Sequence, residues 1–325
     1  MRSRFVFQPI VDAPVPDIHS SRDDQWPSLS NSTRRLDMKS ENTWACALVC
    51  VTVLWGWSFV AIHESLAAVS ASAFNAYRFL IGAAAMFVVL MRRWRHVEWR
   101  AARRGILPGV VLFGAFAFQT AGIARTTASN ASFITGLAVI FAPVFGFWML
   151  RLRPNRQQMA GAAIAAVGLA MLTIQDLAIH VGDALVLGCA VFTALHIVVL
   201  SKRSKGADVE LLAFVQVLVV GVLSLLWSLA FREFSVPAAA QPVWTAVIVG
   251  IGGTAIGYFV QTRAQVESAP GRIALILVLE PVFGGLFGYV LGGDRLSPVN
   301  FAGAALIVVA MIVTEYRPRL RAATH

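Results

Sequence analysis

The sequence predicts an all-α integral membrane protein, whose ten transmembrane helices form two inverted five-helix repeats around a central cavity. Three observations support this fold class: an apolar composition, ten apolar segments of spanning length, and self-similarity between the two halves of the chain. Of the 325 residues, 58% are hydrophobic and only 14% are charged, a balance unlike that of soluble globular domains. The net charge of +10 does not indicate a nucleic-acid partner, because the basic residues lie between apolar runs.

The first 42 residues are polar, mixed in charge and rich in Ser, Asp, Arg and Pro. No continuous apolar stretch follows Arg2 and Arg4 that could form the core of a signal peptide. We therefore expect residues 1–42 to be a disordered cytoplasmic tail. Met38 offers an alternative start, so the sequence leaves open whether residues 1–37 belong to the mature protein.

Ten apolar segments follow from Trp44 onward. A helix needs roughly 20 residues to cross a hydrocarbon core about 30 Å thick, and each segment approaches that length. The expected spans are about 44–62, 71–91, 105–124, 127–150, 157–174, 182–201, 211–231, 242–262, 270–292 and 298–314.

The basic residues predict the orientation of these spans. With the N-terminus in the cytoplasm, the cytoplasmic connections and the C-terminal tail (316–325) carry sixteen Arg and Lys residues. The opposite connections carry only Arg125, Arg232 and Arg295. This bias follows the positive-inside rule, and it predicts a multi-pass protein of the plasma or inner membrane with both termini in the cytoplasm.

Short sequences recur between the two halves of the chain, which predicts one repeat at 43–175 and a second at 181–315. Five helices per repeat is an odd number, so the second repeat enters the membrane inverted. Many secondary transporters are built this way, with a midplane site marked by paired helix breaks. At a shift of 142, Gln119-Thr120 recurs as Gln261-Thr262; at a shift of 138, Arg78 falls on Gln216, and Pro143 falls on Pro281. Pro143 and Pro281 are the expected pair of helix breaks.

Glu280 is the strongest candidate for a functional residue. It lies beside Pro281 near the middle of an apolar run, where a charge costs about 2.5–3.5 kcal/mol on insertion scales. Burial disfavours the charged form of a carboxylate, so Glu280 can be protonated in one state of a transport cycle and ionised in another. A proton-coupled antiporter requires this property. The alternative is that Glu280 stabilises the helix break by hydrogen bonding within the bundle.

Other polar side chains within the spans have two interpretations each. Arg78 is either a bidentate site for a substrate carboxylate or a structural anchor. The amides of Gln119, Gln216 and Gln261 either contact substrate or hydrogen-bond between helices. His196 either titrates near neutrality or is hydrogen-bonded within the bundle.

Aromatic and helix-end residues complete the set of candidates. Trp55 and Tyr258 either line a cavity for aromatic or amphipathic solutes or act as interfacial anchors. Asn130, near the start of the fourth span, either helps an exposed helix N-terminus to receive an anionic group or caps that helix.

Four motifs occur within the spans and one of their connections. They are Trp55 to Ala61 (WGWSFVA), Ala76 to Phe79 (AYRF), Ala128 to Leu137 (ASNASFITGL), and the pair Leu279 to Val282 (LEPV) and Arg295 to Pro298 (RLSP). As a set they resemble the EamA-type permeases of the drug/metabolite transporter (DMT) superfamily, over about residues 44–314. The resemblance implies ten helices in two inverted repeats around a cavity open to one side at a time, and export of amino acids, metabolites or drugs. Two segments differ from the family pattern. Thr193-Ala194 stands where many relatives have a Trp, and the loop Arg151 to Pro154 is basic where many relatives have an acidic loop. The resemblance therefore leaves the identity of the substrate open.

These observations favour a secondary active transporter that exports a small metabolite, amino acid or drug by alternating access, with proton antiport as an open question. The alternative is an integral membrane enzyme acting on a lipid or lipid-linked substrate. The chain lacks the sequence motifs of Ser hydrolases, zinc proteases and P-loop proteins. We therefore expect no catalytic residues, cofactor or metal. The expected partners are a small-molecule substrate and the lipid bilayer, without nucleic acid; a homodimer is compatible with the sequence.

Overall fold

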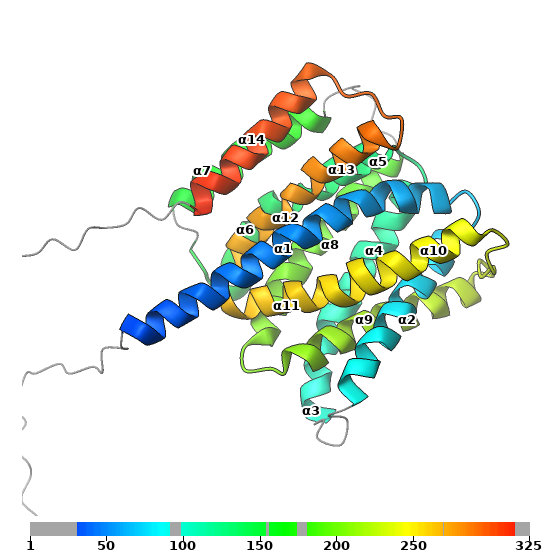
Figure 1. Cartoon of the computed structure of the whole chain (residues 1–325), viewed down its shortest axis with the longest axis horizontal. Helices are drawn as coiled ribbons and strands as arrows, with labels where there is room; N and C mark the ends of the chain where they lie inside the picture. Colours follow the sequence, from blue (N-terminus) through cyan, green and yellow to red (C-terminus); the bar gives the residue numbers. More distant parts are fainter. Residues whose placement is uncertain (1–30, 92–98, 154–155, 174–180, 269, 316–325) are drawn as a thin grey trace, which may run out of the picture. The chain divides into compact units, whose positions relative to one another are not determined.

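The computed structural model describes residues 31–91, 99–153, 156–173, 181–268 and 270–315, and the regular structure within these ranges is helical (Figure 1). Most of the expected N-terminal tail (1–30) and the expected C-terminal tail (316–325) lie outside the described residues. Contacts divide the chain into two units, Met1–Met38 and Lys39–His325, and the arrangement described below is that of the second unit. Helix α1 begins at Asn31, so residues 31–42, which we expected to be disordered, are helical.

The described part of the first half of the chain contains seven α-helices and the 3-10 turn η2. They are α1 (Asn31–Ser65), α2 (Ala71–Leu90), α3 (Trp99–Ala102), η2 (Arg103–Gly105), α4 (Ile106–Ile123), α5 (Ala128–Thr135), α6 (Ala138–Leu150) and α7 (Arg156–Thr173). The described part of the second half continues with α8 (Val181–Ser204), α9 (Val209–Ala230), α10 (Ala240–Ile248), the π-helical η3 (Val249–Ile256), α11 (Gly257–Glu267), α12 (Pro270–Leu277), α13 (Leu279–Val290) and α14 (Pro298–Glu315).

Within the described residues, eight helical segments are long and apolar enough to cross a membrane, and each coincides with an expected span. They are Asn42–Ser65, Ala71–Leu90, Arg103–Ile123, Ala128–Leu150, Val181–Ser204, Val209–Ala230, Ala240–Glu267 and Pro270–Val290. Helices α7 and α14 cover the expected fifth and tenth spans, but their described apolar parts, Met159–Met171 and Pro298–Ala310, are shorter. The chain is therefore a multi-pass, all-helical membrane protein.

Polar side chains at the helix starts satisfy backbone N–H groups that have no partner within the helix. Ser70 accepts from Ala73 N at the start of α2. Asp208 accepts from the first-turn amides of α9. Large apolar side chains elsewhere face outward, among them Trp148 and Trp244. Such exposure would be a liability in water but suits a surface surrounded by lipid.

Three of the spans are interrupted. The fourth span is divided between α5 and α6, where Val139 N donates to Gly136 O (3.1 Å) in a tighter turn than that of an α-helix. The ninth span is divided at Val278, three residues before Pro281. Pro143 lies inside α6, so the interruption of the fourth span lies earlier than the proline at which we expected it. The two interruptions, unlike the two prolines, correspond at the shift of 142, since Gly136 falls on Val278.

The eighth span contains an interruption that hydropathy does not reveal. Its middle part, η3, is π-helical and contains three glycines in the sequence VGIGGTAI. Each π turn contains an extra residue relative to an α turn, which changes the direction of the following side chains and carbonyl groups. Such segments are frequent at functional sites.

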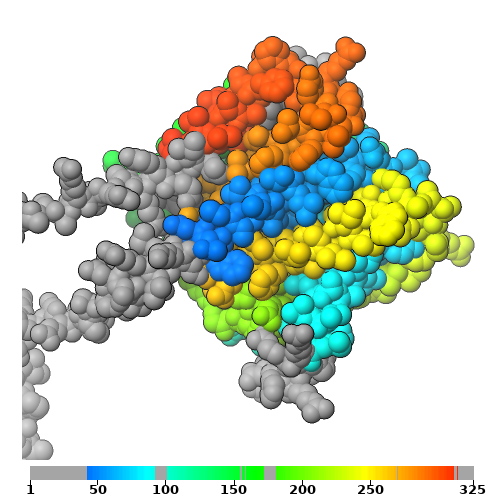
Figure 2. Space-filling model, viewed as in Figure 1, coloured from blue at the N-terminus to red at the C-terminus, as the bar shows by residue number. Residues whose placement is uncertain are grey.

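Helices from the two halves of the chain pack against each other rather than forming separate bundles. Helix α2 packs on α9, α4 on α8 and α9, α5 on α13, α6 on α12, and α7 on α14. Figure 1 shows α7 and α14 side by side at one edge of this unit. Figure 2 shows α1 between the ninth span (orange) and the eighth span (yellow) on one face. The interior of this unit is therefore lined by residues from both halves.

Candidate functional site

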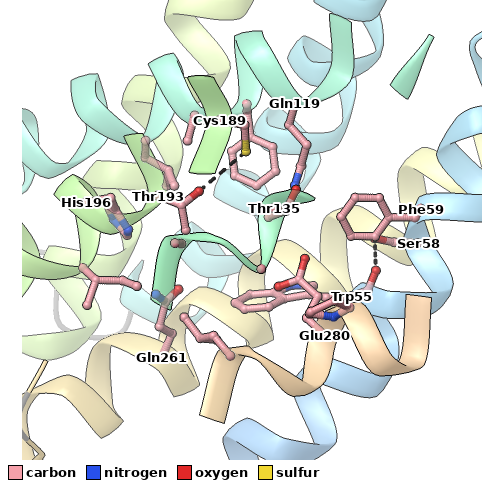
Figure 3. Close-up of a pocket in the computed structure, with 18 of the residues that line it drawn as sticks. Trp55, Ser58, Phe59, Gln119, Thr135, Cys189, Thr193, His196, Gln261 and Glu280 are labelled. Atoms are coloured by element: carbon pink, nitrogen blue, oxygen red, sulfur yellow. Dashed lines mark hydrogen bonds between the residues drawn. The ribbon is translucent and has the colours of Figure 1, made fainter. Parts of the chain in front are cut away.

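A cavity lies at the interrupted part of the fourth and ninth spans (Figure 3). It has about 60 Å³ of space open to the centres of water-sized molecules, which is room for several waters. Helices α1, α2, α4, α8 and α11 complete its wall. Its polar lining comprises Arg78, Glu280, His196, Tyr258, Gln119, Gln261, Ser58, Thr135, Thr193 and Cys189, and its aromatic lining includes Trp55, Phe59 and Phe116.

The cavity brings together most of the candidate residues identified from the sequence. Those that line it are Glu280, Arg78, Trp55, Gln119, His196, Tyr258, Gln261 and Pro281. Gln216, Asn130 and Pro143 are not part of this lining. Figure 3 shows Gln119, Glu280 and Gln261 reaching the cavity from three different helices.

Glu280 lies in the first turn of α13, directly after the interruption at Val278. Its side chain is half-buried and lines the cavity. Its backbone carbonyl accepts a hydrogen bond from Ser132 Oγ (3.4 Å), while its carboxylate forms no hydrogen bond or ion pair with the described residues. The first turn of a helix favours a negative charge, which offsets part of the cost of placing the carboxylate here. Glu280 is therefore available to a solute in the cavity.

The two interrupted spans meet beside Glu280. A Cβ atom added to Gly136 would lie 2.7 Å from Pro281 Cγ, so only glycine permits this approach. Further along the same pair of helices, Gly284 packs on the side chain of Ser132. The cavity therefore lies where α5 and α13 are in tight contact.

Arg78 is only 2% exposed, yet it lines the cavity. Its Nε donates to Thr254 Oγ1 (2.9 Å), and its guanidinium carbon lies 4.7 Å from the ring centroid of Phe116 and 5.1 Å from that of Phe79. These contacts fix the orientation of the planar guanidinium group. Its two terminal nitrogens have no hydrogen-bond partner within the described part of the chain, so they can receive an anionic group from solute.

The π-helical segment positions two residues of the cavity wall. Gly253 O accepts a hydrogen bond from Trp55 Nε1 (2.6 Å), and the next residue, Thr254, binds Arg78. The indole of Trp55 also packs on the ring of Tyr258, with 5.5 Å between centroids. Trp55 and Tyr258 therefore belong to the cavity wall rather than to an interfacial belt.

His196 forms a hydrogen bond with Gln216, which lies outside the cavity lining. The Nε2 atom of His196 is 2.8 Å from Gln216 Oε1, and Gln216 Nε2 donates to Thr262 Oγ1 (2.8 Å). Gln216 is fully buried. Its hydrogen bond to His196 connects it to the cavity lining.

Asn130 and Gln261 occupy different environments. Thr127, not Asn130, caps α5, because its Oγ1 accepts from Asn130 N (3.1 Å). The anionic group at this helix N-terminus is the protein's own Asp294, which accepts from Ser129 N (3.0 Å). Gln261 does line the cavity, and its Oε1 is buried without a partner among the described residues. Such an atom is costly unless a solute or water satisfies it.

Sequence reasoning did not identify several small polar residues of the site. Ser58, Thr135 and Thr193 line the cavity, and Thr254 holds Arg78. Each lies within an apolar span, near the depth of a stronger candidate. Small hydroxyl residues are common in membrane helices, so their position within a span does not by itself identify them as site residues.

The family model for "EamA-like transporter family" matches residues 42–174 and 180–316. The chain belongs to this family. EamA proteins are part of the DMT superfamily, so the resemblance seen in the sequence motifs is confirmed. The match covers the eight spans and the three interruptions described above, and it includes every residue of the cavity lining.

Of the following three curated relatives of this EamA chain, two carry transporter names without a stated substrate. An "Uncharacterized transporter" of Archaeoglobus fulgidus is 29% identical over 83% of this chain and 85% of its own length. The "Uncharacterized transporter YwfM" of Bacillus subtilis is 25% identical over 81% of this chain and 91% of its own length. The "Protein LicB" of Haemophilus influenzae is 23% identical over 73% of this chain and 85% of its own length.

A solved structure shares the fold of this EamA chain. It superposes with a TM-score of 0.68 over 83% of this chain and 96% of the other, at 21% sequence identity. At that identity the similarity concerns the arrangement of helices alone.

Proposed function

We propose that this EamA-family protein is a secondary active transporter that exports a small solute by alternating access. The observation that carries the proposal is the central cavity, in which the carboxylate of Glu280 has no described partner at the contact of two interrupted helices. An intramembrane charge of this kind costs free energy and persists where it serves a substrate or ion pathway. A structural role would instead leave the carboxylate hydrogen-bonded within the bundle.

We propose further that the ten expected spans form two inverted repeats, with both termini in the cytoplasm. The helix pairings support this arrangement, because α2 packs on α9, α5 on α13 and α7 on α14, which are equivalent spans of the two halves. The two segments matched by the family model also support it. Rocking of one repeat against the other would then expose the cavity to each side in turn.

Glu280 is the proposed coupling residue. Arg78 and Glu280 line one cavity without forming an ion pair within 4 Å, so each charge is open to solute. A solute with a cationic or N–H group competes with a proton for the single carboxylate of Glu280. Competition for one site is what couples the two flows in opposite directions, so the proposed mode is proton antiport.

The test begins with a panel of metabolites and toxins, comparing intracellular levels and growth inhibition with and without expression. Expression should lower the intracellular level of the transported solute. Lowering the external pH should speed export, because it increases the inward proton gradient. Accumulation of the solute would show uptake and contradict the proposed direction.

The variant Glu280→Gln keeps the size of the side chain but cannot exchange a proton. It should insert normally and lose proton-driven export at every external pH. Glu210→Gln, near the start of α9 and outside the cavity lining, is the matched control and should behave as wild type. Wild-type rates in Glu280→Gln across the pH range would exclude a coupling role for this carboxylate.

A further inference from the structure

Three hydrogen bonds in series connect the backbone of α11 to the cavity. Thr262 Oγ1 lies 2.6 Å from Tyr258 O, Gln216 Nε2 lies 2.8 Å from Thr262 Oγ1, and His196 Nε2 lies 2.8 Å from Gln216 Oε1. Gln216 is 0% exposed and His196 is 1% exposed. The side chains of Gln216 and Thr262 are buried outside the cavity lining, so the donors and acceptors of these bonds follow from the protein groups.

The donor and the acceptor in each of these hydrogen bonds follow from the backbone carbonyl of Tyr258, at which the series begins. A carbonyl oxygen only accepts, so the single hydroxyl proton of Thr262 is donated to Tyr258 O. Thr262 Oγ1 must then accept from Gln216, which requires that the amide nitrogen of Gln216 faces it. The Oε1 atom of Gln216 consequently faces His196 Nε2, and this oxygen can only accept.

The imidazole of His196 therefore carries a proton on Nε2. In the neutral ring the other nitrogen, Nδ1, then holds a lone pair. Nδ1 has no partner among the described residues, and His196 lines the cavity. The ring is also fixed in orientation by Tyr258, whose ring packs edge-on against it with 6.1 Å between centroids.

We propose that His196 contacts the transported solute as a hydrogen-bond acceptor through Nδ1, and that Gln216 and Thr262 are positioning residues that hold it in this tautomer. The inference rests on the proposed transport function and deepens it. The solute would carry an N–H or O–H donor near its anionic group, since the terminal nitrogens of Arg78 supply donors elsewhere on the same wall. Gln261 Oε1, also without a partner among the described residues, adds a second acceptor.

The tautomer is testable without any solute. Nitrogen-15 NMR of the full-length protein, labelled at the histidine ring nitrogens and assigned with His196→Asn, distinguishes a protonated ring nitrogen from an unprotonated one. We expect the His196 signals of a neutral ring protonated on Nε2. A ring protonated on Nδ1 alone would overturn the proposal. This measurement does not depend on transport, so it separates failure of the inference from failure of the proposed function.

Solute contact is tested with three carboxylates that share one carbon skeleton: L-leucine, 2-hydroxy-4-methylpentanoate and 4-methylpentanoate. They differ only in carrying an ammonium, a hydroxyl or a hydrogen at carbon 2. Their apolar chain suits the lining residues Leu112, Val139 and Ile197. The readout is the concentration of each that gives half-maximal thermal stabilisation of the purified protein. The two donor-bearing solutes should act at about tenfold lower concentration than 4-methylpentanoate, because one hydrogen bond is then satisfied.

Two substitutions of His196 distinguish the role of Nδ1 from that of Nε2. In His196→Asn the side-chain oxygen can take the place of Nδ1, so the preference for donor-bearing solutes should persist. In His196→Gln the amide takes the place of Nε2, so the contact with Gln216 persists but the preference should disappear. The reverse pattern would show that His196 only holds the bundle together. Equal stabilisation of the wild type by all three solutes, or by none of them, would also overturn the proposal.

The positioning role of Gln216 is tested by comparing a variant that removes its acceptor with one that keeps an acceptor. Gln216→Met removes the acceptor and should abolish most of the tenfold preference, whereas Gln216→Glu keeps an acceptor and should retain it. A purely structural role would lower the thermal stability of the variants without changing the preference between solutes. That result would contradict the positioning role of Gln216.

Discussion

Arg78 illustrates how a buried cation can be kept available to solute. One hydrogen bond to Thr254 Oγ1 and the faces of two phenylalanine rings hold its guanidinium. These contacts use the Nε side and the plane of the group, so the two terminal nitrogens are left for the cavity. The sequence could predict Arg78 as a candidate because a charge within an apolar span is conspicuous. It could not predict Thr254, because a threonine among apolar residues has no distinctive pattern.

The contact between Arg78 and Thr254 gives a prediction at the residue scale. Thr254→Val keeps the shape but removes the acceptor, so the guanidinium loses its orientation. Hydrogen bonds to charged groups contribute about 1.5–3 kcal/mol, so the apparent affinity for the transported solute should fall at least about tenfold. Uptake into vesicles as a function of solute concentration measures this effect. Thr254→Ser keeps the hydroxyl and should stay within about threefold of wild type; equal losses in both variants would assign the effect to packing instead.

Gln216, Asn130 and Pro143 show what residue type alone cannot decide. Each lies within its expected span, but its contacts depend on neighbours from other parts of the chain. Gln216 lies outside the cavity lining and hydrogen-bonds to His196, and Asp294 accepts a hydrogen bond at the helix N-terminus near Asn130. Long-range partners of this kind are set by the packing of spans far apart in the sequence.

At the scale of elements, eight of the ten expected spans coincide with described helices long enough to cross a membrane, whereas two of the three interruptions were not predicted. Runs of apolar residues limited by charged connections predict where a helix crosses the membrane. The interruptions depend on close contacts between spans: Gly136 meets Pro281, and Gly82 meets the backbone of Gly250 in η3. Proline indicated one interruption out of three. Gly253 in η3 and Gly257 at the start of α11 both lie against the indole of Trp55, a partner far away in the sequence.

The contact of the two interrupted spans gives a prediction at this scale. Gly136→Ala places a methyl group 2.7 Å from Pro281 Cγ and 2.9 Å from Leu169 Cδ2. Overpacking of this kind typically costs about 1–3 kcal/mol, so the thermal unfolding temperature of the purified protein should fall. Gly146→Ala on the adjoining helix is the matched control, because its added methyl group meets no atom within 4 Å. Alanine also favours the helix, so this control should be as stable as wild type or more so, and a comparable loss in both variants would contradict the role of the contact.

At the scale of the whole transmembrane unit, the cavity is separated from a second pocket by apolar residues. Ile62 and Ile123 line the cavity, while the following residues His63 and Ala124 line the second pocket together with Arg125, Asp294 and others. The two linings therefore adjoin at Ile62 and His63 on α1, where Val60 also lines the second pocket, and at Ile123 and Ala124 at the end of α4. His63 Nδ1 donates to Ile123 O (3.0 Å) and joins the two helices at this layer. Hydropathy could not predict this layer, because isoleucines that close a path look like any others in an apolar span.

If the chain works by alternating access, the apolar layer must open during each cycle. Ile62→Cys and Ile123→Cys, combined in a chain whose three native cysteines are replaced, allow a short bifunctional thiol reagent to join α1 to α4. Ile62 and Ile123 belong to one cluster of buried apolar residues, so the two thiols should be within reach of such a reagent. Cross-linking should reduce transport to the level of cells without the protein, and cleavage of a reducible linker should restore it. Single-cysteine variants treated identically should keep their activity. Undiminished transport by the fully cross-linked pair would show that solute does not pass between α1 and α4, and would place the moving contact elsewhere in the bundle.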